Sequence, residues 1–284
     1  MTRVDSTDGV QVALYDYGGS GPTLLLAHAT GFHGRVWSPV ASHLRDFHVN
    51  SLDLRGHGDS VTPAGVTFEW ENFGDDVLAV VDTLAACDDN DFDGHGLLGA
   101  VHSMGGASLL LAEEKRPSTF ASLYLYEPIV FPAARGHPQP ENPLAVGALK
   151  RREVFDSFDA AYANFAAKPP LQALHPDALR AYVDHGFVEQ PDATVRLKCR
   201  PATESAVYTM VPQHTAWDRL VDVTCPVTVA MGKDAPFTPA SFAPAIVDRL
   251  AHGRLEQHPG IGHFGPLEAP EVIARAIRAA LAPA

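Results

Sequence analysis

Positively charged residues are scarce in this sequence. Its 284 residues include 21 lysines and arginines against 34 aspartates and glutamates, which gives a formal net charge of −13 at pH 7. Nucleic acids and anionic membrane surfaces attract basic proteins, so we expect neither of them as a partner. The excess of acidic residues favours solubility instead.

Cysteines and long apolar runs are also scarce. Cys87, Cys199 and Cys225 are odd in number and lack the spacing of metal ligands, and the fourteen histidines form no cluster with carboxylates or cysteines. This composition predicts no metal site. No apolar run approaches the length of a membrane span, and the first residues contain no apolar stretch like that of a signal peptide. We therefore expect a cytoplasmic protein.

The composition of the chain changes between residues 128 and 222. This segment carries many prolines, the basic cluster Lys150-Arg151-Arg152 and patterns of helical period, but no convincing strand pattern. We expect residues 1–127 and 223–284 to form one α/β core, into which residues 128–222 are inserted as a helical unit. The helical patterns of this unit cover residues 144–155, 160–167 and 176–187.

A strand that turns abruptly into a helix is predicted near residue 103. The apolar run Leu97–Val101 stops at His102-Ser103-Met104-Gly105-Gly106, and a second apolar run of helical character follows at once. Such a turn strains the serine backbone so that the hydroxyl stands clear of the sheet, and the helix N-terminus directs free N–H groups at whatever the hydroxyl attacks. Ser103 is therefore the candidate nucleophile, and the alternative is a serine that only caps the helix.

Two motifs resemble the α/β-hydrolase superfamily. Val101-His102-Ser103-Met104-Gly105 is similar to its nucleophile elbow G-x-S-x-G, with Val101 in place of the first glycine, and Asp53-Leu54-Arg55-Gly56-His57-Gly58-Asp59-Ser60 is similar to its structural loop D-x-R-G-x-G-x-S. The resemblance implies an α/β-hydrolase fold with a mostly parallel central sheet, helices on both faces and an inserted helical cap. It also implies that the Asp and Arg of the structural loop pair, and that His57 serves packing rather than catalysis.

The loop after the predicted strand Thr23–Ala27 resembles the place where this superfamily keeps its second oxyanion donor. His28-Ala29-Thr30-Gly31-Phe32 is similar to the family's His-Gly-x loop, with Ala29 in place of the glycine. The resemblance implies an oxyanion hole made by the backbone N–H groups of Thr30 and Met104. Two fixed N–H dipoles of this kind contribute about 3 to 4 kcal/mol each in a dry site.

His263 is the candidate general base. It lies in the glycine-rich loop 259–264, directly after the last predicted strand, and this is the position of the base in the superfamily. Of the fourteen histidines, it is the one whose order and setting fit the resemblance. The alternative is an ordinary exposed loop histidine.

Two carboxylates are candidates to orient His263. The commoner family position follows the seventh strand in a pattern like G-x-x-D-x-x-x-P and suggests Asp234, but alignment of Gly232 and Pro239 with this pattern places Asp234 one residue early. Glu127 closes the sixth strand, which is the other place from which the superfamily supplies its acid. An acid at the end of an apolar strand is costly to bury without a partner, and His263 is available. We favour Glu127 and keep Asp234 as the alternative.

The resemblance implies covalent catalysis. His263 would take the proton of Ser103, the serine oxygen would attack an acyl carbon, and water would then release the acyl group without any cofactor. The resemblance implies hydrolysis of an ester, thioester or lactone bond. Aromatic residues are frequent in segment 128–222, so we expect the substrate to be an apolar small molecule. The alternatives are an acyltransferase or carbon–carbon bond hydrolase with the same residues, and a small-molecule receptor that keeps them without turnover.

Overall fold

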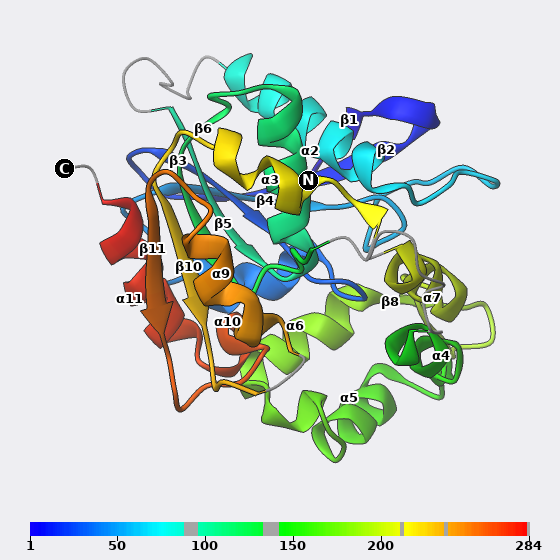
Figure 1. The fold of residues 1–284 in the computed structure, drawn as a ribbon. Coiled ribbons are helices and arrows are strands. Elements are labelled where there is room, and N and C mark those ends of the chain that lie inside the picture. Colours follow the sequence, from blue (N-terminus) through cyan, green and yellow to red (C-terminus); the bar gives the residue numbers. More distant parts are fainter. Residues whose placement is uncertain (88–95, 133–141, 211–212, 236–237, 283–284) are drawn as a thin grey trace.

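The computed structural model describes residues 1–87, 96–132, 142–210, 213–235 and 238–282. A central eight-stranded sheet has the strand order β1-β2-β4-β3-β5-β6-β10-β11 (Figure 1). The strands from β4 to β11 in this order are parallel, and β2 is antiparallel to both its neighbours. The strands are β1 Thr2–Asp5, β2 Gln11–Gly18, β3 Thr23–Ala27, β4 His48–Asp53, β5 Leu97–His102, β6 Phe120–Tyr126, β10 Val227–Met231 and β11 Gly253–Gln257.

Each face of this sheet is covered by its own hydrophobic core. In β3, Leu25 and Ala27 belong to one core, whereas Leu24 and Leu26 belong to the other. Successive side chains of a strand point to opposite faces, so a strand that is buried on both faces is apolar throughout. This is why the central strands are continuous apolar runs in the sequence.

Helices supply the other half of both cores, as the predicted α/β fold requires. On one face, α2 (Trp70–Ala85) and α3 (Met104–Lys115) bury apolar side chains; on the other, α1 (Ser38–Ala41) and α11 (Pro270–Leu281) do so. Among the described residues, no helix has both the length and the apolar character needed to cross a bilayer. The shorter helices outside residues 143–210 are η1 Thr7–Gly9, η2 Gly34–Trp37, α8 Ala216–Arg219, η5 Leu220–Asp222, η6 Pro239–Phe242, α9 Ala243–Val247 and α10 Gly265–Glu268.

Between β6 and β10 the chain leaves the sheet and forms a group of helices, coloured green to olive in Figure 1. The patterns at 160–167 and 176–187 are confirmed as helices α5 and α6. The pattern at 144–155 is helical only in its first half, which ends at Leu149. The helices are α4 Pro143–Leu149, α5 Phe158–Ala166, η3 Leu171–Ala173, α6 Pro176–Gly186 and α7 Pro201–Met210.

The expectation that this segment contains no strand is wrong. Val154–Phe155 (β7), Phe187–Glu189 (β8) and Val195–Leu197 (β9) form a small antiparallel sheet in the order β7-β9-β8. Strands of two or three residues are too short to show an alternating pattern, so the sequence did not reveal them. The division of the chain at residues 128 and 222 remains a prediction, and residues 133–141 and 211–212 of that insertion lie outside the described residues.

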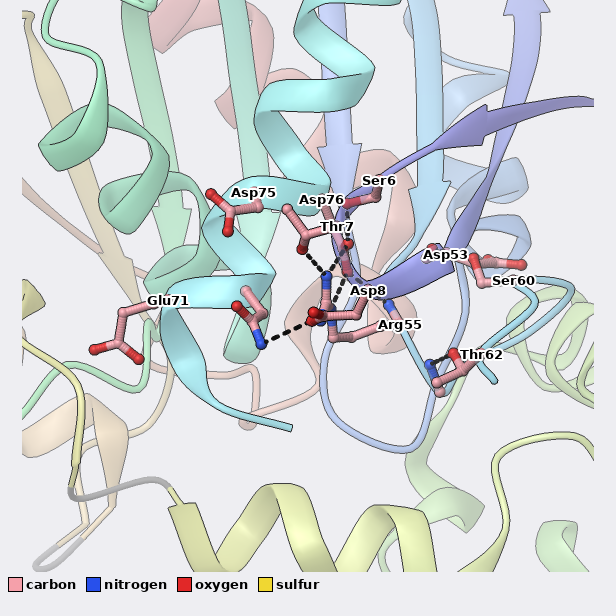
Figure 2. A network of polar contacts seen from close by, with 12 residues as sticks. Ser6, Thr7, Asp8, Asp53, Arg55, Ser60, Thr62, Glu71, Asp75 and Asp76 are labelled. Carbon is pink, nitrogen blue, oxygen red and sulfur yellow. Dashed lines mark hydrogen bonds and ion pairs between the residues drawn. The ribbon is translucent and has the colours of Figure 1, made fainter. Parts of the chain in front are cut away.

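Arg55 has no exposed surface and joins the loop after β4 to two other segments (Figure 2). Its guanidinium donates hydrogen bonds of 2.9 and 2.8 Å to the two carboxylate oxygens of Asp76 in α2. It also donates to Thr7 Oγ1 at 2.8 Å and to Asp8 Oδ2 at 3.2 Å. Because a buried charge is stable only with well-placed partners, these contacts fix the loop against α2 and the turn after β1.

Asp53, at the end of β4, binds a different set of groups. Its carboxylate accepts hydrogen bonds from the backbone N–H of Gly34 at 2.5 Å and of Asp59 at 2.6 Å, and from the Tyr15 hydroxyl at 2.7 Å. Burial raises the pKa of this carboxyl group to about 6. The predicted pairing of the loop's Asp with its Arg is therefore wrong. Both side chains hold the loop, but each binds to a different part of the core.

The Arg55 network generates a prediction about stability. Arg55→Leu should lower the free energy of unfolding by about 3 to 5 kcal/mol, because Asp76 would stay buried without its partner. Urea denaturation measures this change. The matched control is Arg116→Leu, which removes an ion pair with Asp82 whose side chains are both exposed and should cost less than about 1 kcal/mol. Equal losses in the two variants would contradict the role given to Arg55.

Candidate active site

Ser103 occupies the turn between β5 and α3 in a strained conformation. Its φ and ψ are 54° and −110°, outside the regions that a residue with a side chain normally adopts. Its N–H donates to the carbonyl of Tyr126 at 3.0 Å, and its own carbonyl accepts from the N–H of Ile129 at 3.2 Å. The end of β6 and the residues just after it thus hold the serine backbone through both its N–H and its carbonyl group.

The residues around Ser103 are small because the backbones nearly touch. A Cβ atom on Gly105 would lie 2.6 Å from the carbonyl oxygen of Ala27, and one on Gly106 would lie 2.5 Å from the Cβ of Pro128. Val101, which replaces the first glycine of the motif, is completely buried in the hydrophobic core beside α3. The hydrophobic core thus accommodates the side chain of Val101.

His263 and Glu127 are joined by a hydrogen bond. His263 Nδ1 lies 2.6 Å from Glu127 Oε2, and the other carboxylate oxygen of Glu127 accepts the N–H of Gly232 at 2.9 Å. Glu127 is 1% exposed, so its charge is shielded from water and both its oxygens have partners. Such a bond makes Nδ1 the protonated nitrogen of a neutral ring and leaves Nε2 free to accept a proton.

Neighbouring groups fix the loop that carries His263. The Tyr126 hydroxyl donates to the carbonyl of Gly262 at 2.8 Å, and the carboxylate of Glu268 accepts the N–H of Gly262 at 2.8 Å. The ring of His102 lies against that of His263, with 4.9 Å between the centroids. Burial and the nearby His263 lower the pKa of His102 well below its usual value, so His102 stays neutral beside the candidate base.

Asp234 has a different environment from Glu127. It follows β10 in an exposed position, whereas Glu127 is buried and bonded to the His263 ring. The structure therefore brings Ser103, His263 and Glu127 to one edge of the sheet and leaves Asp234 facing solvent. The sequence could not identify the contact between Gly232 and Glu127, because a backbone N–H carries no residue-specific signal.

The candidate oxyanion residues lie on the loop after β3 and at the start of α3. Thr30 is 3% exposed and Met104 is fully buried. Met104 is the first residue of α3, where a backbone N–H has no acceptor within the helix. The N–H of Gly105 donates to the carbonyl of His28 at 3.0 Å, which holds the loop beside the serine turn. The hydroxyl of Thr30 is buried and has no hydrogen-bond partner among the described residues.

His57 is held by the structural loop and lies against His28. Its Nδ1 is 2.9 Å from the carbonyl oxygen of Arg55, and its ring centroid is 5.0 Å from that of His28. Burial lowers the pKa of His57 to about 4, so the ring is neutral near pH 7. These contacts support the packing role that the sequence motif implies.

One known family matches this chain over most of its length. The model of the alpha/beta hydrolase family matches residues 24–276, a range that contains Thr30, Ser103, Glu127 and His263. This protein belongs to the alpha/beta hydrolase family. The predicted superfamily and fold class are thereby confirmed.

Curated relatives of this hydrolase include two lipases. It is 37% identical over 115 residues to lipase LipV of Mycobacterium tuberculosis, a stretch that covers 40% of each chain. It is 32% identical over 109 residues to the monoglyceride lipase of Homo sapiens, which covers 38% of this chain and 35% of that one. The similarity thus spans about two fifths of these relatives.

Solved structures match the hydrolase over nearly its whole length. E-2-(acetamidomethylene)succinate hydrolase superposes with a TM-score of 0.76 at 22% identity, covering 99% of this chain and 98% of that one. The enol-lactonase from Burkholderia xenovorans LB400 gives a TM-score of 0.71 at 18% identity, covering 99% and 100% of the two chains. At these identities the likeness shows the fold alone.

A cavity of about 560 Å³ lies between the core of the hydrolase and its helical segment. The core contributes Thr30, Phe32 and Phe264, of which Phe264 follows the candidate base His263. Ser103 and His263 do not line the cavity themselves, so it meets the candidate site through Thr30 and Phe264. The helical segment contributes the aromatic side chains Phe155, Phe165, Tyr182 and Tyr208.

An ion pair from the helical segment lies over the loop after β3, which carries Thr30 and Gly31. Arg151 bonds to the carboxylate of Glu204 and to the hydroxyl of Tyr182, and all three side chains line the cavity. A Cβ atom on Gly31, whose φ is 81°, would lie 2.6 Å from Glu204 Oε1. The sequence did not reveal that Arg151, Glu204 and Tyr182 contact one another. Arg151 stands in a visible basic run, but nothing in the sequence links it to Glu204.

Proposed function

We propose that this protein is a serine hydrolase that cleaves an ester-like bond, of the ester, thioester or lactone type, through an acyl-enzyme. The proposal is carried by the buried hydrogen bond between Glu127 and His263, which lies beside a strained serine at a strand-to-helix turn. A nucleophile, a base and an acid that orients the base are the parts that acyl transfer needs.

In the proposed reaction, His263 Nε2 removes the proton of the Ser103 hydroxyl as its oxygen attacks the carbonyl carbon of the substrate. Negative charge then develops on the carbonyl oxygen and is stabilised by the N–H groups of Thr30 and Met104. The leaving group takes the proton from His263. A water molecule, activated by the same histidine, adds to the acyl-enzyme and releases the acid. Glu127 holds the imidazole in one tautomer and balances its charge.

Two further observations support this proposal. Two curated relatives of the chain are named lipases, which favours the cleavage of an ester bond. The cavity also combines aromatic walls with a volume in the range that binds small molecules. We propose an acyl or alcohol part with an apolar body as its occupant, beneath a cap formed by residues 128–222.

Removal of either reacting residue tests the mechanism. Ser103→Ala and His263→Ala should each lower kcat for p-nitrophenyl esters by on the order of 10⁴ to 10⁶-fold, because neither residue acts without the other. Circular dichroism of both variants would check that the fold is intact. Retention of more than about a tenth of the activity in Ser103→Ala would show that the covalent mechanism is wrong.

A comparison of the two candidate acids tests the role of Glu127. Glu127→Gln should lower kcat/KM by about 10³ to 10⁴-fold, since the imidazole loses its counter-charge and its fixed tautomer. Asp234→Asn is the matched control, because it makes the same change in an exposed carboxylate and should cost less than about tenfold. If Asp234→Asn proved the more damaging change, the acid would come from the loop after β10.

A further inference from the structure

We propose that the substrate of this hydrolase carries a carboxylate group, which binds to cationic side chains on the helical side of the cavity. The inference rests on the proposed function, because it assigns the substrate class of the same site. Its basis is the charge of the cavity lining, which is opposite in sign to the charge of the protein as a whole.

Four cationic side chains and one carboxylate are found among the described residues that line the cavity. The cations are Lys150, Arg151, Arg152 and Lys168, and the carboxylate is Glu204. The whole chain has a net charge of −13, so a random sample of its charged residues would be mainly acidic. The cavity wall is therefore a local concentration of positive charge, which attracts an anionic ligand.

The charge of Glu204 is already balanced within the protein. Its carboxylate bonds to Arg151, and the Arg151 side chain is 22% exposed while that of Glu204 is 7% exposed. Burial of this kind is stable because the two charges neutralise each other. Lys150, Arg152 and Lys168 are therefore the cationic groups of the cavity whose charge Glu204 does not neutralise.

These three side chains have little compensation from nearby acids. Within the described part of the chain, no carboxylate is paired with Lys150 or Lys168, and the ammonium group of Lys168 bonds instead to the amide oxygen of Asn164 at 2.7 Å. Arg152 lies 3.7 Å from Asp156, whose side chain is 89% exposed. Such an exposed pair is weak and leaves the guanidinium able to bind another anion.

The positions of Lys150, Arg152 and Lys168 suit a substrate that reaches from Ser103 to the helical segment. Thr30 and Phe264 mark the end of the cavity at the proposed oxyanion hole, whereas Lys150 and Arg152 follow α4 and Lys168 follows α5. The Arg152 guanidinium lies over the ring of Phe155, 4.4 Å from its centroid. Aromatic walls can thus contact the body of the ligand while the cations bind its carboxylate.

Two matched pairs of esters test this inference. The first is 4-nitrophenyl hydrogen adipate, with a carboxylate on the acyl side, against its neutral methyl ester. The second is 4-butanoyloxybenzoate, with a carboxylate on the alcohol side, against its neutral methyl ester. We expect at least about a tenfold higher kcat/KM for the charged member of one pair at low ionic strength, and a smaller ratio in high salt.

Variants test whether the preference for the charged ester comes from the lysines of the cavity. In Lys150→Gln/Lys168→Gln the ratio of charged to neutral kcat/KM should fall at least about fivefold, because the attraction for the carboxylate is lost. Arg275→Gln removes a cation on α11 that pairs with Glu271 outside the cavity, and it should leave the ratio unchanged.

The outcomes separate this inference from the proposed function. Hydrolysis of the neutral esters with a ratio near one in both pairs would overturn the carboxylate site and keep the serine hydrolase. If Arg275→Gln lowered the ratio of charged to neutral kcat/KM as much as the lysine variant does, the carboxylate site would also be overturned. The preference would then come from the overall charge of the protein. Failure of wild-type protein to hydrolyse any of the four esters, with Ser103 unreactive, would contradict the proposed function itself.

Discussion

The strained backbone at Ser103 is the constraint on which the rest of the site depends. A residue with a side chain in such a conformation costs about 1 to 3 kcal/mol and persists only where the surroundings enforce it. Here the carbonyl of Tyr126 and the N–H of Ile129 hold the serine, and Gly105 packs against Ala27. A larger residue at Gly105 would separate β3 from α3. The close packing of the sheet against α3 thus maintains the turn.

The register of the sheet then brings the other groups to the same place. Ala27 is paired with Val101, and His102 is paired with Tyr126. The residues that follow these strands therefore leave the sheet at one edge, which brings the loop after β3, Ser103 and Glu127 together. Glu127 also has a positive φ of 43°, and its carboxylate bonds both to His263 and to the N–H of Gly232 after β10. The neighbouring strands β5, β6 and β10 thus determine where His263 can lie.

The sequence predicted the parts of this arrangement that leave a long or chemically distinct pattern. The buried strand Thr23–Ala27 is an almost continuous apolar run, and it was predicted with the bounds that the structure shows. Glu127 was favoured because an acid at the end of an apolar strand needs a partner, and the structure provides one in His263. Its role as the triad acid remains a proposal.

Other features depend on contacts between distant residues and could not be predicted. The strand Val154–Phe155 forms because Val195–Leu197 lies beside it, not because two residues favour a strand. Arg55 was expected to pair with an aspartate of its own loop, yet its partner is Asp76, 21 positions away in α2. The charge of the cavity likewise combines side chains that follow α4 and α5 with one from α7. In each case the fold, rather than the local sequence, decides the neighbour.

Covalent labelling of the nucleophile tests the central claim most directly. The protein would be incubated with a serine-directed phosphonate, digested and analysed by mass spectrometry. The account predicts that the added mass appears on the peptide that contains Ser103 and on no other, and that labelling is slowed in His263→Ala. Labelling of a different peptide, or undiminished labelling of Ser103→Ala, would contradict it.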